Sequence, residues 1–302
     1  MSESPPRFVY AVHGLTIASV LECPELPAGH GPPHVEVRYG TVPTHLDNPR
    51  KAGVLFEVSP DSYLLRVDAV ARYWARAGRE IVIEPTPDAD AVDVRTFLFG
   101  PVINALLHQR GALVLHAGGV VGPRGALLVA GESGRGKSTA VAALANRGYQ
   151  ILTDDVAAIV LDGDDRPLVW PGSPQLRLWP DAIARLGYDM ALASPVRPGV
   201  DKFTVDMQEQ FSAEPQPLGA VYLLEAHNGS ELEIERLENS ARFDAVRSHT
   251  RNFRVIEGLG MQRAHFRMAA AIAARVPVIR LKRPRTGDSV DAIAGMIDEA
   301  LQ

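Results

Sequence analysis

The sequence predicts an α/β protein in which a small strand-rich domain, residues 1–88, precedes a larger domain of alternating strands and helices, residues 89–302. Three observations predict this organisation. The first part of the chain is a series of short apolar or alternating segments separated by turn-forming residues. From Asp88 onward, apolar residues at helical spacing alternate with apolar runs of strand length. One such strand and one such helix enclose the glycine-rich loop, Gly131–Ser138.

The amino-acid composition indicates a folded protein and argues against several classes of protein. Of the 302 residues, 46% are hydrophobic, which supports a sizeable core and excludes a disordered chain. The 31 basic and 36 acidic residues give a net charge of −5, which does not favour a nucleic-acid binder held by phosphate contacts. Cys23 is the single cysteine, so the chain forms no internal disulfide and no cysteine-rich zinc site.

The start of the chain carries no pattern of a secretory signal. Residues 1–6 are polar or proline, without the basic start and apolar stretch of a signal peptide. No apolar run approaches the ~20 residues that a membrane helix needs. We therefore expect a cytoplasmic protein with no membrane partner.

The first domain is predicted to consist of short strands. Gly14 marks a turn between the first two, and the Pro-Thr-Pro sequence at 85–87 ends the last. Residues 67–76 are compatible with more than one structure. The predicted strands are 8–13, 15–20, 35–39, 53–58, 63–67 and 80–84.

The second domain opens with a helix over residues 90–109, in which Pro101 predicts a kink. Gly148 ends the helix that follows the glycine-rich loop. The predicted order after the first helix is strands 113–115, 118–121 and 126–130, helix 137–147, strand 149–153, a hairpin of 156–161 and 167–170, helix 181–186, strands 218–225 and 232–237, helices 241–256 and 261–276, strand 277–281 and helix 289–301.

The glycine-rich loop reads Gly131-Glu132-Ser133-Gly134-Arg135-Gly136-Lys137-Ser138 and matches the pattern G-x4-G-K-S/T. Its glycines let successive backbone N–H groups point at phosphate oxygens, and the following helix N-terminus adds partial positive charge. Lys137 can bridge the β- and γ-phosphates, and the Ser138 hydroxyl can bind Mg²⁺. The loop, with Thr139 after it, is the predicted nucleotide-binding site; a chance match in a glycine-rich turn is the alternative.

A pair of acidic residues, Asp154 and Asp155, ends the predicted strand 149–153. Because this strand follows the helix of the loop, we expect it beside the strand 126–130, with its carboxyl end toward the phosphates. One carboxylate there can bind Mg²⁺, and the other can accept the proton of an attacking hydroxyl. A solvated turn is the alternative.

His116 ends an apolar strand, and the chain then returns through a hairpin to the strand of the glycine-rich loop. This course can bring His116 to the loop, although a lone histidine is more often structural. Four cations follow the sheet in loops typical of substrate-facing segments. Each could neutralise a transferring phosphoryl group or lie on the surface; they are Arg177, Arg185, Arg197 and Lys202.

These motifs together resemble a known family. Leu115-His116-Ala117, the glycine-rich loop and Gly148-Tyr-Gln-Ile-Leu-Thr-Asp154-Asp155 resemble the C-terminal catalytic domain of the HPr serine kinase/phosphorylase family, which is related to ATP-dependent phosphoenolpyruvate carboxykinase. The resemblance is strongest over residues 110–160. Most of the chain is similar to one branch, the HPr-kinase-like proteins of lasso-peptide biosynthesis, as in Tyr10-Ala-Val-His-Gly14, Asp201-Lys202-Phe-Thr-Val-Asp206 and Val276-Pro-Val-Ile-Arg-Leu281.

In that branch the enzyme phosphorylates a serine at the C-terminal end of a precursor peptide. The resemblance implies the fold of the HPr kinase type, ATP and Mg²⁺ as cofactors, and a place for His116 in the site. It places Lys137 on the phosphates, and Ser138 with an aspartate, Asp154, on the metal. Thr139 stands where the HPr-directed enzymes have glutamate, so HPr is not the implied acceptor.

We therefore expect an ATP-dependent kinase that acts on a serine hydroxyl of a precursor peptide or other protein acceptor. Asp155 would take the proton and Asp154 would serve the metal, or the two roles would be exchanged. A kinase for a small molecule such as free serine, and a nucleotide-binding regulatory module that transfers nothing, are the alternatives. A homo-oligomer is compatible with the sequence. The predicted catalytic residues are Asp155, Asp154, His116, Lys137 and Lys202.

Overall fold

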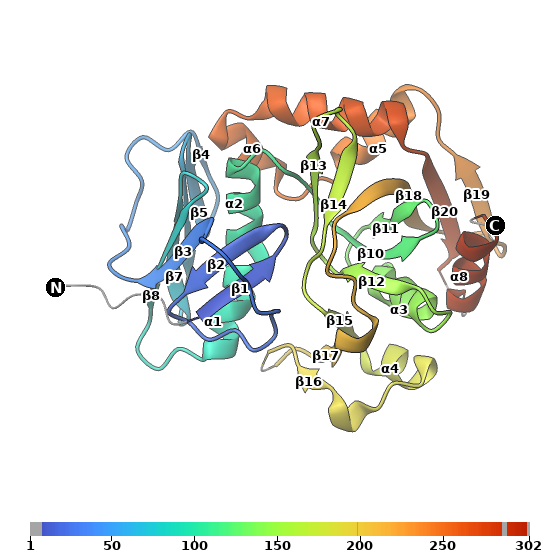
Figure 1. Ribbon diagram of the computed structural model, residues 1–302, viewed down its shortest axis with the longest axis horizontal. Helices are drawn as coiled ribbons and strands as arrows, with labels where there is room; N and C mark the ends of the chain where they lie inside the picture. The colour runs from blue at the N-terminus through green and yellow to red at the C-terminus, as the bar shows by residue number, and fades with distance from the viewer. Residues whose placement is uncertain (1–7, 198, 286–288, 301–302) are drawn as a thin grey trace. The chain divides into compact units, whose positions relative to one another are not determined.

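The computed structural model describes residues 8–197, 199–285 and 289–300, and the chain divides into two compact units (Figure 1). Unit 1 comprises Met1–Val114 and Arg251–Phe266, and unit 2 comprises Leu115–Thr250 and Arg267–Gln302. The division therefore falls after Val114, not near residue 88, where the change in apolar spacing had predicted it. The reason is that the helices following residue 88 pack on strands of unit 1: the Tyr73 hydroxyl donates to the Val94 carbonyl at 3.0 Å.

Unit 1 is built on a mixed sheet with the strand order β1-β2-β3-β8-β7-β6-β5-β4. Strand β3 pairs in parallel with both β2 and β8, and the other neighbours are antiparallel. The segment that sequence left open is strand β7, whose alternate residues Ala71, Tyr73 and Ala75 are buried as period-two burial requires. The strands are β1 (Phe8–Val12), β2 (Leu15–Ser19), β3 (Val35–Tyr39), β4 (Lys51–Ala52), β5 (Phe56–Ser59), β6 (Ser62–Val67), β7 (Ala71–Arg76) and β8 (Glu80–Pro85).

The helices between residues 91 and 109 of unit 1 confirm the predicted kink, and those between 240 and 275, which belong to both units, correct one prediction. Pro101 lies in a π-helical turn, η1 (Leu98–Val102), which separates α1 (Ala91–Phe97) from α2 (Ile103–Gln109). The single helix predicted over residues 241–256 is interrupted, because Asn252 has a left-handed backbone with φ of 53°. The result is three helices in succession: α5 (Ser240–Ser248), α6 (Phe253–Leu259) and α7 (Gln262–Arg275).

A buried carboxylate, Glu57 on β5, gives unit 1 a testable pH dependence. It accepts hydrogen bonds from Leu46 N at 2.7 Å and Arg66 Nη1 at 2.8 Å, and lies 2.8 Å from His45 Nδ1. Burial opposes its charge, but these hydrogen bonds outweigh burial and lower the pKa of Glu57 from 4.5 to about 2. Because the folded pKa is the lower one, the stabilisation is present above pH 4.5 and is lost as the pH falls toward 2.

We predict that Glu57→Gln lowers the free energy of unfolding by about 2 kcal/mol at neutral pH. The difference from the wild type should shrink as the pH falls from 4.5 toward 2, where Glu57 itself becomes protonated. Urea unfolding of both proteins over a series of pH values measures it. A difference that stays constant over this range would contradict the assigned role of the charge.

Unit 2 contains a sheet with the strand order β12-β10-β11-β18-β14-β13. The central strands β11, β18 and β20 run parallel, and β19 pairs antiparallel with β20. Their bounds are β10 (Ala117–Gly122), β11 (Gly125–Gly131), β12 (Gln150–Thr153), β13 (Ala157–Leu161), β14 (Pro167–Trp170), β18 (Gln216–His227), β19 (Glu233–Arg236) and β20 (Val278–Pro284); β9 (Leu113–Leu115) precedes them.

The position of β12 differs from the prediction. Strand β10, not β12, is the neighbour of β11, because the hairpin at Gly122–Gly125 pairs β10 with the whole of β11 while β18 occupies the other edge. Strand β12 pairs antiparallel with β10, so it runs in the same direction as β11. The carboxyl end of β12 therefore still reaches the edge of the sheet where β11 ends.

A small separate sheet with the order β15-β17-β16 was not predicted from sequence. Its strands, β15 (Gln175–Leu178), β16 (Ser194–Pro195) and β17 (Phe203–Asp206), are too short to show a period. Helix α4 (Pro180–Leu186) and the turns η2 (Met190–Leu192) and η3 (Gln208–Gln210) belong to the same region of the chain.

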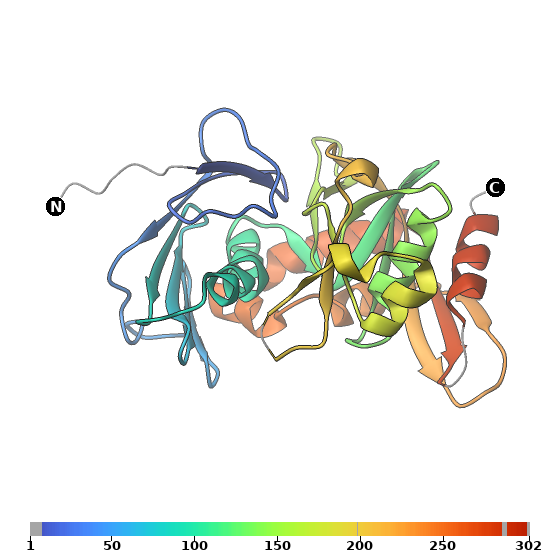
Figure 2. The same cartoon turned by 90° about the horizontal axis from the view of Figure 1, so that it is seen from below.

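Two helices pack on one another and on the sheet of unit 2: α3 (Lys137–Ala145) and α8 (Val290–Glu299). Val141 and Leu144 of α3 and Ile293 and Ile297 of α8 are buried in one core with Val129 of β11. Figures 1 and 2 both show α8 beside the β19–β20 ribbon. The last residues of the helix predicted over 289–301 lie outside the described part. Within that part, no helix combines the length and apolar character needed to cross a bilayer.

Candidate functional site

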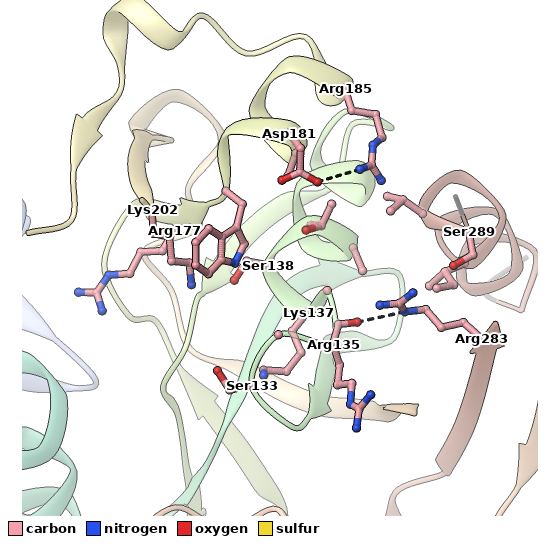
Figure 3. Close-up of a pocket in the computed structure, with 18 of the residues that line it drawn as sticks. Ser133, Arg135, Lys137, Ser138, Arg177, Asp181, Arg185, Lys202, Arg283 and Ser289 are labelled. Carbon is pink, nitrogen blue, oxygen red and sulfur yellow. Dashed lines mark hydrogen bonds and ion pairs between the residues drawn. The ribbon is translucent and has the colours of Figure 1, made fainter. Parts of the chain in front are cut away.

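The glycine-rich loop joins the buried strand β11 to helix α3 and borders a cavity of about 260 Å³ (Figure 3). Gly134 and Gly136 have left-handed backbones, with φ of 78° and 92°, which L side chains rarely adopt. Residues 133–139 of the predicted nucleotide site line the cavity. Gly131 and Glu132 are not among its lining residues.

Glu132 and Arg135 form an ion pair on the outside of the loop. The Glu132 carboxylate accepts from Arg135 Nε at 3.0 Å, and three-quarters of its side chain is exposed. The contribution of Glu132 to the site is its backbone carbonyl, which accepts from Lys137.

Lys137 begins helix α3, and its side chain is almost fully buried. Its ammonium group donates to the Glu132 carbonyl at 2.9 Å and to His116 Nε2 at 2.9 Å. A buried ammonium needs such acceptors, since an unpaired buried charge is costly. The structure thus brings His116 to the loop, which is one of the two outcomes that the sequence left open.

His116 connects Lys137 to Asp155. The other ring nitrogen, Nδ1, lies 3.2 Å from Asp155 Oδ1 and 3.2 Å from the Asp155 backbone carbonyl. A carboxylate and a carbonyl only accept hydrogen bonds, and an ammonium only donates them. These partners therefore place the ring proton on Nδ1 and leave a lone pair on Nε2.

We predict that nitrogen-15 NMR of histidine-labelled protein without nucleotide finds His116 neutral with its proton on Nδ1. This is the rarer tautomer of free histidine, so the signal distinguishes it from an unconstrained ring. Lys137→Met removes the donor at Nε2 and should relax the preference. A wild-type signal with the proton on Nε2 would contradict the arrangement.

Asp154 contacts the loop through Ser138. The Ser138 hydroxyl donates to Asp154 Oδ1 at 2.9 Å, and Arg177 N donates to Oδ2 at 3.0 Å. Burial raises the pKa of Asp154 above its ordinary value, and the neighbouring Asp155 charge adds to this; the hydrogen bonds and the charge of Lys202 act in the opposite direction. A carboxylate in this position gains from a bound cation.

Gly118 of β10 gives Asp154 the room to reach Ser138. A Cβ at Gly118 would lie 3.0 Å from Asp154 Oδ1 and 2.9 Å from Val141 Cγ2. Because β10 lies between β12 and β11, the Asp154 carboxylate has to pass this strand on its way to α3. A glycine within a strand, such as Gly118, is the sequence feature that indicates a close approach of another group to the strand.

Asp155 has a different orientation from Asp154, because its backbone is left-handed with φ of 67°. Its side chain lines the cavity, and its Oδ2 lies 4.0 Å from Arg177 Nη1. Two consecutive carboxylates thus have separate partners: Ser138 for Asp154, and His116 for Asp155. With separate partners, one carboxylate can bind a metal ion while the other accepts a proton.

The remaining wall of the cavity includes three of the four predicted cations, Arg177, Arg185 and Lys202, but not Arg197. Residues that sequence reasoning missed come from α3 and α4 and from the end of β20 and the start of α8. A usable signal existed for β20, since ligands bind at the carboxyl ends of parallel strands. The missed residues are Ala140 of α3 and Trp179, Asp181, Ala182, Arg283, Ser289, Val290 and Ile293.

The donor atoms at the loop fit Mg²⁺ held together with phosphate. Ser138 Oγ and the Asp154 carboxylate are adjacent hard oxygen donors, which Mg²⁺ prefers. No cluster of three or more histidine, cysteine or acidic side chains suited to a metal occurs in the described residues. A cation at Ser138 and Asp154 would be bound through one carboxylate, a hydroxyl, substrate phosphates and water.

The backbone of the chain is similar to that of solved structures. No protein-family model matches the chain, and no curated protein matches it. Among solved structures, the chain is similar to the Hpr(Ser) kinase/phosphatase from Coxiella burnetii, with 13% sequence identity over 62% of this chain and 95% of that one, and a TM-score of 0.35.

Proposed function

We propose that the chain is an ATP-dependent kinase that transfers the γ-phosphoryl group to a serine hydroxyl of a peptide or protein acceptor. One observation carries the proposal: Ser138 at the helix start lies 2.9 Å from Asp154, while the adjacent Asp155 faces the cavity with His116 on its carboxylate. A module that only binds a nucleotide has no need of a second, separately oriented carboxylate.

The loop, Lys137 and Asp155 each have a separate role in the proposed reaction. Backbone N–H groups of the glycine-rich loop and the Lys137 ammonium hold the triphosphate and offset negative charge in the transition state. The acceptor oxygen attacks the γ-phosphorus, the bond to the β–γ bridging oxygen breaks, and ADP leaves with that electron pair. The hydroxyl proton passes to Asp155, whose carboxylate His116 orients through Nδ1–H.

Mg²⁺ would be held by Ser138 and Asp154 and would supply neutralisation of phosphate charge. The position of the Asp154 carboxylate, fixed by Arg177 N, keeps it apart from the base. Positioning and charge stabilisation then supply most of the rate.

The specific acceptor that we propose is the serine at the C-terminal end of a lasso-peptide precursor. Support for it comes from the similarity of residues 10–14, 201–206 and 276–281 to that branch of kinases. The cations Arg177 and Lys202 line the cavity, and their positive charge favours an acidic or C-terminal segment of the acceptor.

The experiment is incubation of the chain with ATP and Mg²⁺ and one of three acceptors, followed by mass spectrometry. The acceptors are a synthetic peptide ending in serine, the same peptide ending in alanine, and free serine. Addition of one phosphoryl group to the serine peptide alone supports the proposal. Transfer to free serine only would replace it with a small-molecule kinase, and nucleotide binding without transfer to any acceptor would overturn it.

A further inference from the structure

We propose that the molecule phosphorylated here carries a carboxylate close to the reacting hydroxyl, and that Arg177 and Lys202 bind this carboxylate. The proposal rests on the proposed kinase function and names the chemistry of its substrate. Both side chains line the cavity of the glycine-rich loop. Sequence reasoning assigned Lys202 to the phosphoryl group instead, and the structure gives reasons for a different role.

The first reason is the side of the loop on which the two cations lie. Arg177 on β15 and Lys202, next to β17, come from paired strands, in which Leu178 faces Phe203. Figure 3 shows both on one side of Ser138, whereas Arg283 lies on the other.

The positions of Asp154 and Asp155 indicate that the acceptor binds on the same side of the loop as Arg177. Arg177 donates its backbone N–H to Asp154, and its guanidinium lies 4.0 Å from Asp155. A base must contact the attacking hydroxyl, and the attacking and leaving oxygens lie roughly in line on opposite faces of the phosphorus. The acceptor therefore enters next to Arg177 and Lys202, and the rest of the nucleotide extends away from them.

The second reason is charge. Lys202 is half-buried, and in the described part of the chain its ammonium makes no hydrogen bond or ion pair. The carboxylate nearest to the Arg177 guanidinium is Asp155, at 4.0 Å. By contrast, the other cations of the cavity have close protein partners, in the contacts Arg135–Glu132, Arg185–Asp181, Arg283–Arg135 carbonyl and Lys137–Glu132 carbonyl.

Two neighbouring cations at the acceptor's side favour an anion there, because the Arg177 guanidinium has only the 4.0 Å contact with Asp155 and Lys202 makes no hydrogen bond or ion pair in the described part of the chain. An arginine fork binds a carboxylate through two parallel hydrogen bonds, and a lysine adds a point charge. On a serine peptide, such a carboxylate is either the C-terminus of a terminal serine or the side chain of an acidic neighbour. Both sources present the same chemistry to Arg177 and Lys202, so the test separates them.

The test compares three synthetic peptides: one ending in serine with a free carboxylate, the same peptide amidated, and an amidated peptide with aspartate after the serine. The proposal expects the wild type to prefer at least one carboxylate-bearing peptide over the plain amide by about tenfold or more in kcat/KM. The preferred peptide identifies the source. Equal kcat/KM for all three would overturn the proposal.

Lys202→Met then assigns the preference to the site. We expect KM for the preferred peptide to rise about tenfold, and the preference for the carboxylate-bearing peptide over the plain amide in kcat/KM to be lost. Lys282→Met, a lysine paired with Glu233 on the β19–β20 ribbon, is the control and should alter none of these values. An equal loss for every acceptor would show that Lys202 serves the phosphoryl group, contrary to the proposal.

A failure of the proposed kinase function can be distinguished from a failure of the carboxylate site. If the wild type phosphorylates no peptide, calorimetry with Mg²⁺ and a non-hydrolysable ATP analogue still measures binding of the acid and amide forms. Tighter binding of the acid form that Lys202→Met abolishes supports the carboxylate site without kinase activity. Equal affinity for the two forms overturns it.

Discussion

Lys137→Met is expected to reduce phosphoryl transfer by about a thousandfold or more while leaving the fold intact. The Lys137 ammonium lies beside the glycine-rich loop at the start of helix α3, and the side chain is almost fully buried. The ammonium donates hydrogen bonds to Glu132 O and His116 Nε2. In the reaction it exchanges these acceptors for phosphate oxygens. Methionine keeps the length and the apolar stem of lysine but offers neither charge nor donor.

Stability should hardly change in this variant. Removing a buried charge relieves its desolvation, and this offsets the cost of about 1–3 kcal/mol for each of the two acceptors that lose a donor. Thermal unfolding and a transfer assay on the same preparation therefore separate the two effects, and Lys282→Met on β20 provides a lysine lost from the same unit without contact to the cavity. A variant that phosphorylates its acceptor at the wild-type rate would place the reaction elsewhere in the molecule.

The parts of this site that sequence predicted are those encoded within short stretches of chain. The glycine-rich loop requires glycine at Gly134 and Gly136 for left-handed backbone, and a strand and helix on either side, all of which can be read locally. Asp154 and Asp155 were found because they end a strand close to the loop in sequence. The order of strands allowed His116 to reach the loop but left a structural role open, and the structure joins it to Lys137.

What sequence did not predict depends on contacts between distant segments. The prediction that β12 adjoins β11 was wrong because nothing in either strand shows that the β10 hairpin takes that edge first. The glycine at position 118 held the relevant information, yet its role appears only when Asp154 is seen beside it. Likewise Arg283 and Ser289 join the cavity through β20 and α8, more than a hundred residues after the loop.

Replacing Asp155 by asparagine is the second change with a large expected effect, a loss of about a hundredfold or more in turnover. The amide cannot accept the hydroxyl proton, although it fits the same space. Asparagine also tolerates the left-handed backbone of Asp155, with φ of 67°, so the substitution tests the carboxylate without disturbing the chain. Asp155→Ala lacks that tolerance and would add about 1 kcal/mol of backbone strain.

Asp165→Asn is a matched control for this variant. Asp165 is also a left-handed aspartate, with φ of 58°, but it lies in the exposed β13–β14 turn and does not line the cavity. Both variants should melt within a few degrees of the wild type, since neither removes a buried apolar contact. Only Asp155→Asn should lose turnover, because its carboxylate lines the cavity and contacts His116. If activity and melting temperature fell together in Asp155→Asn, the carboxylate would hold the fold rather than accept the proton.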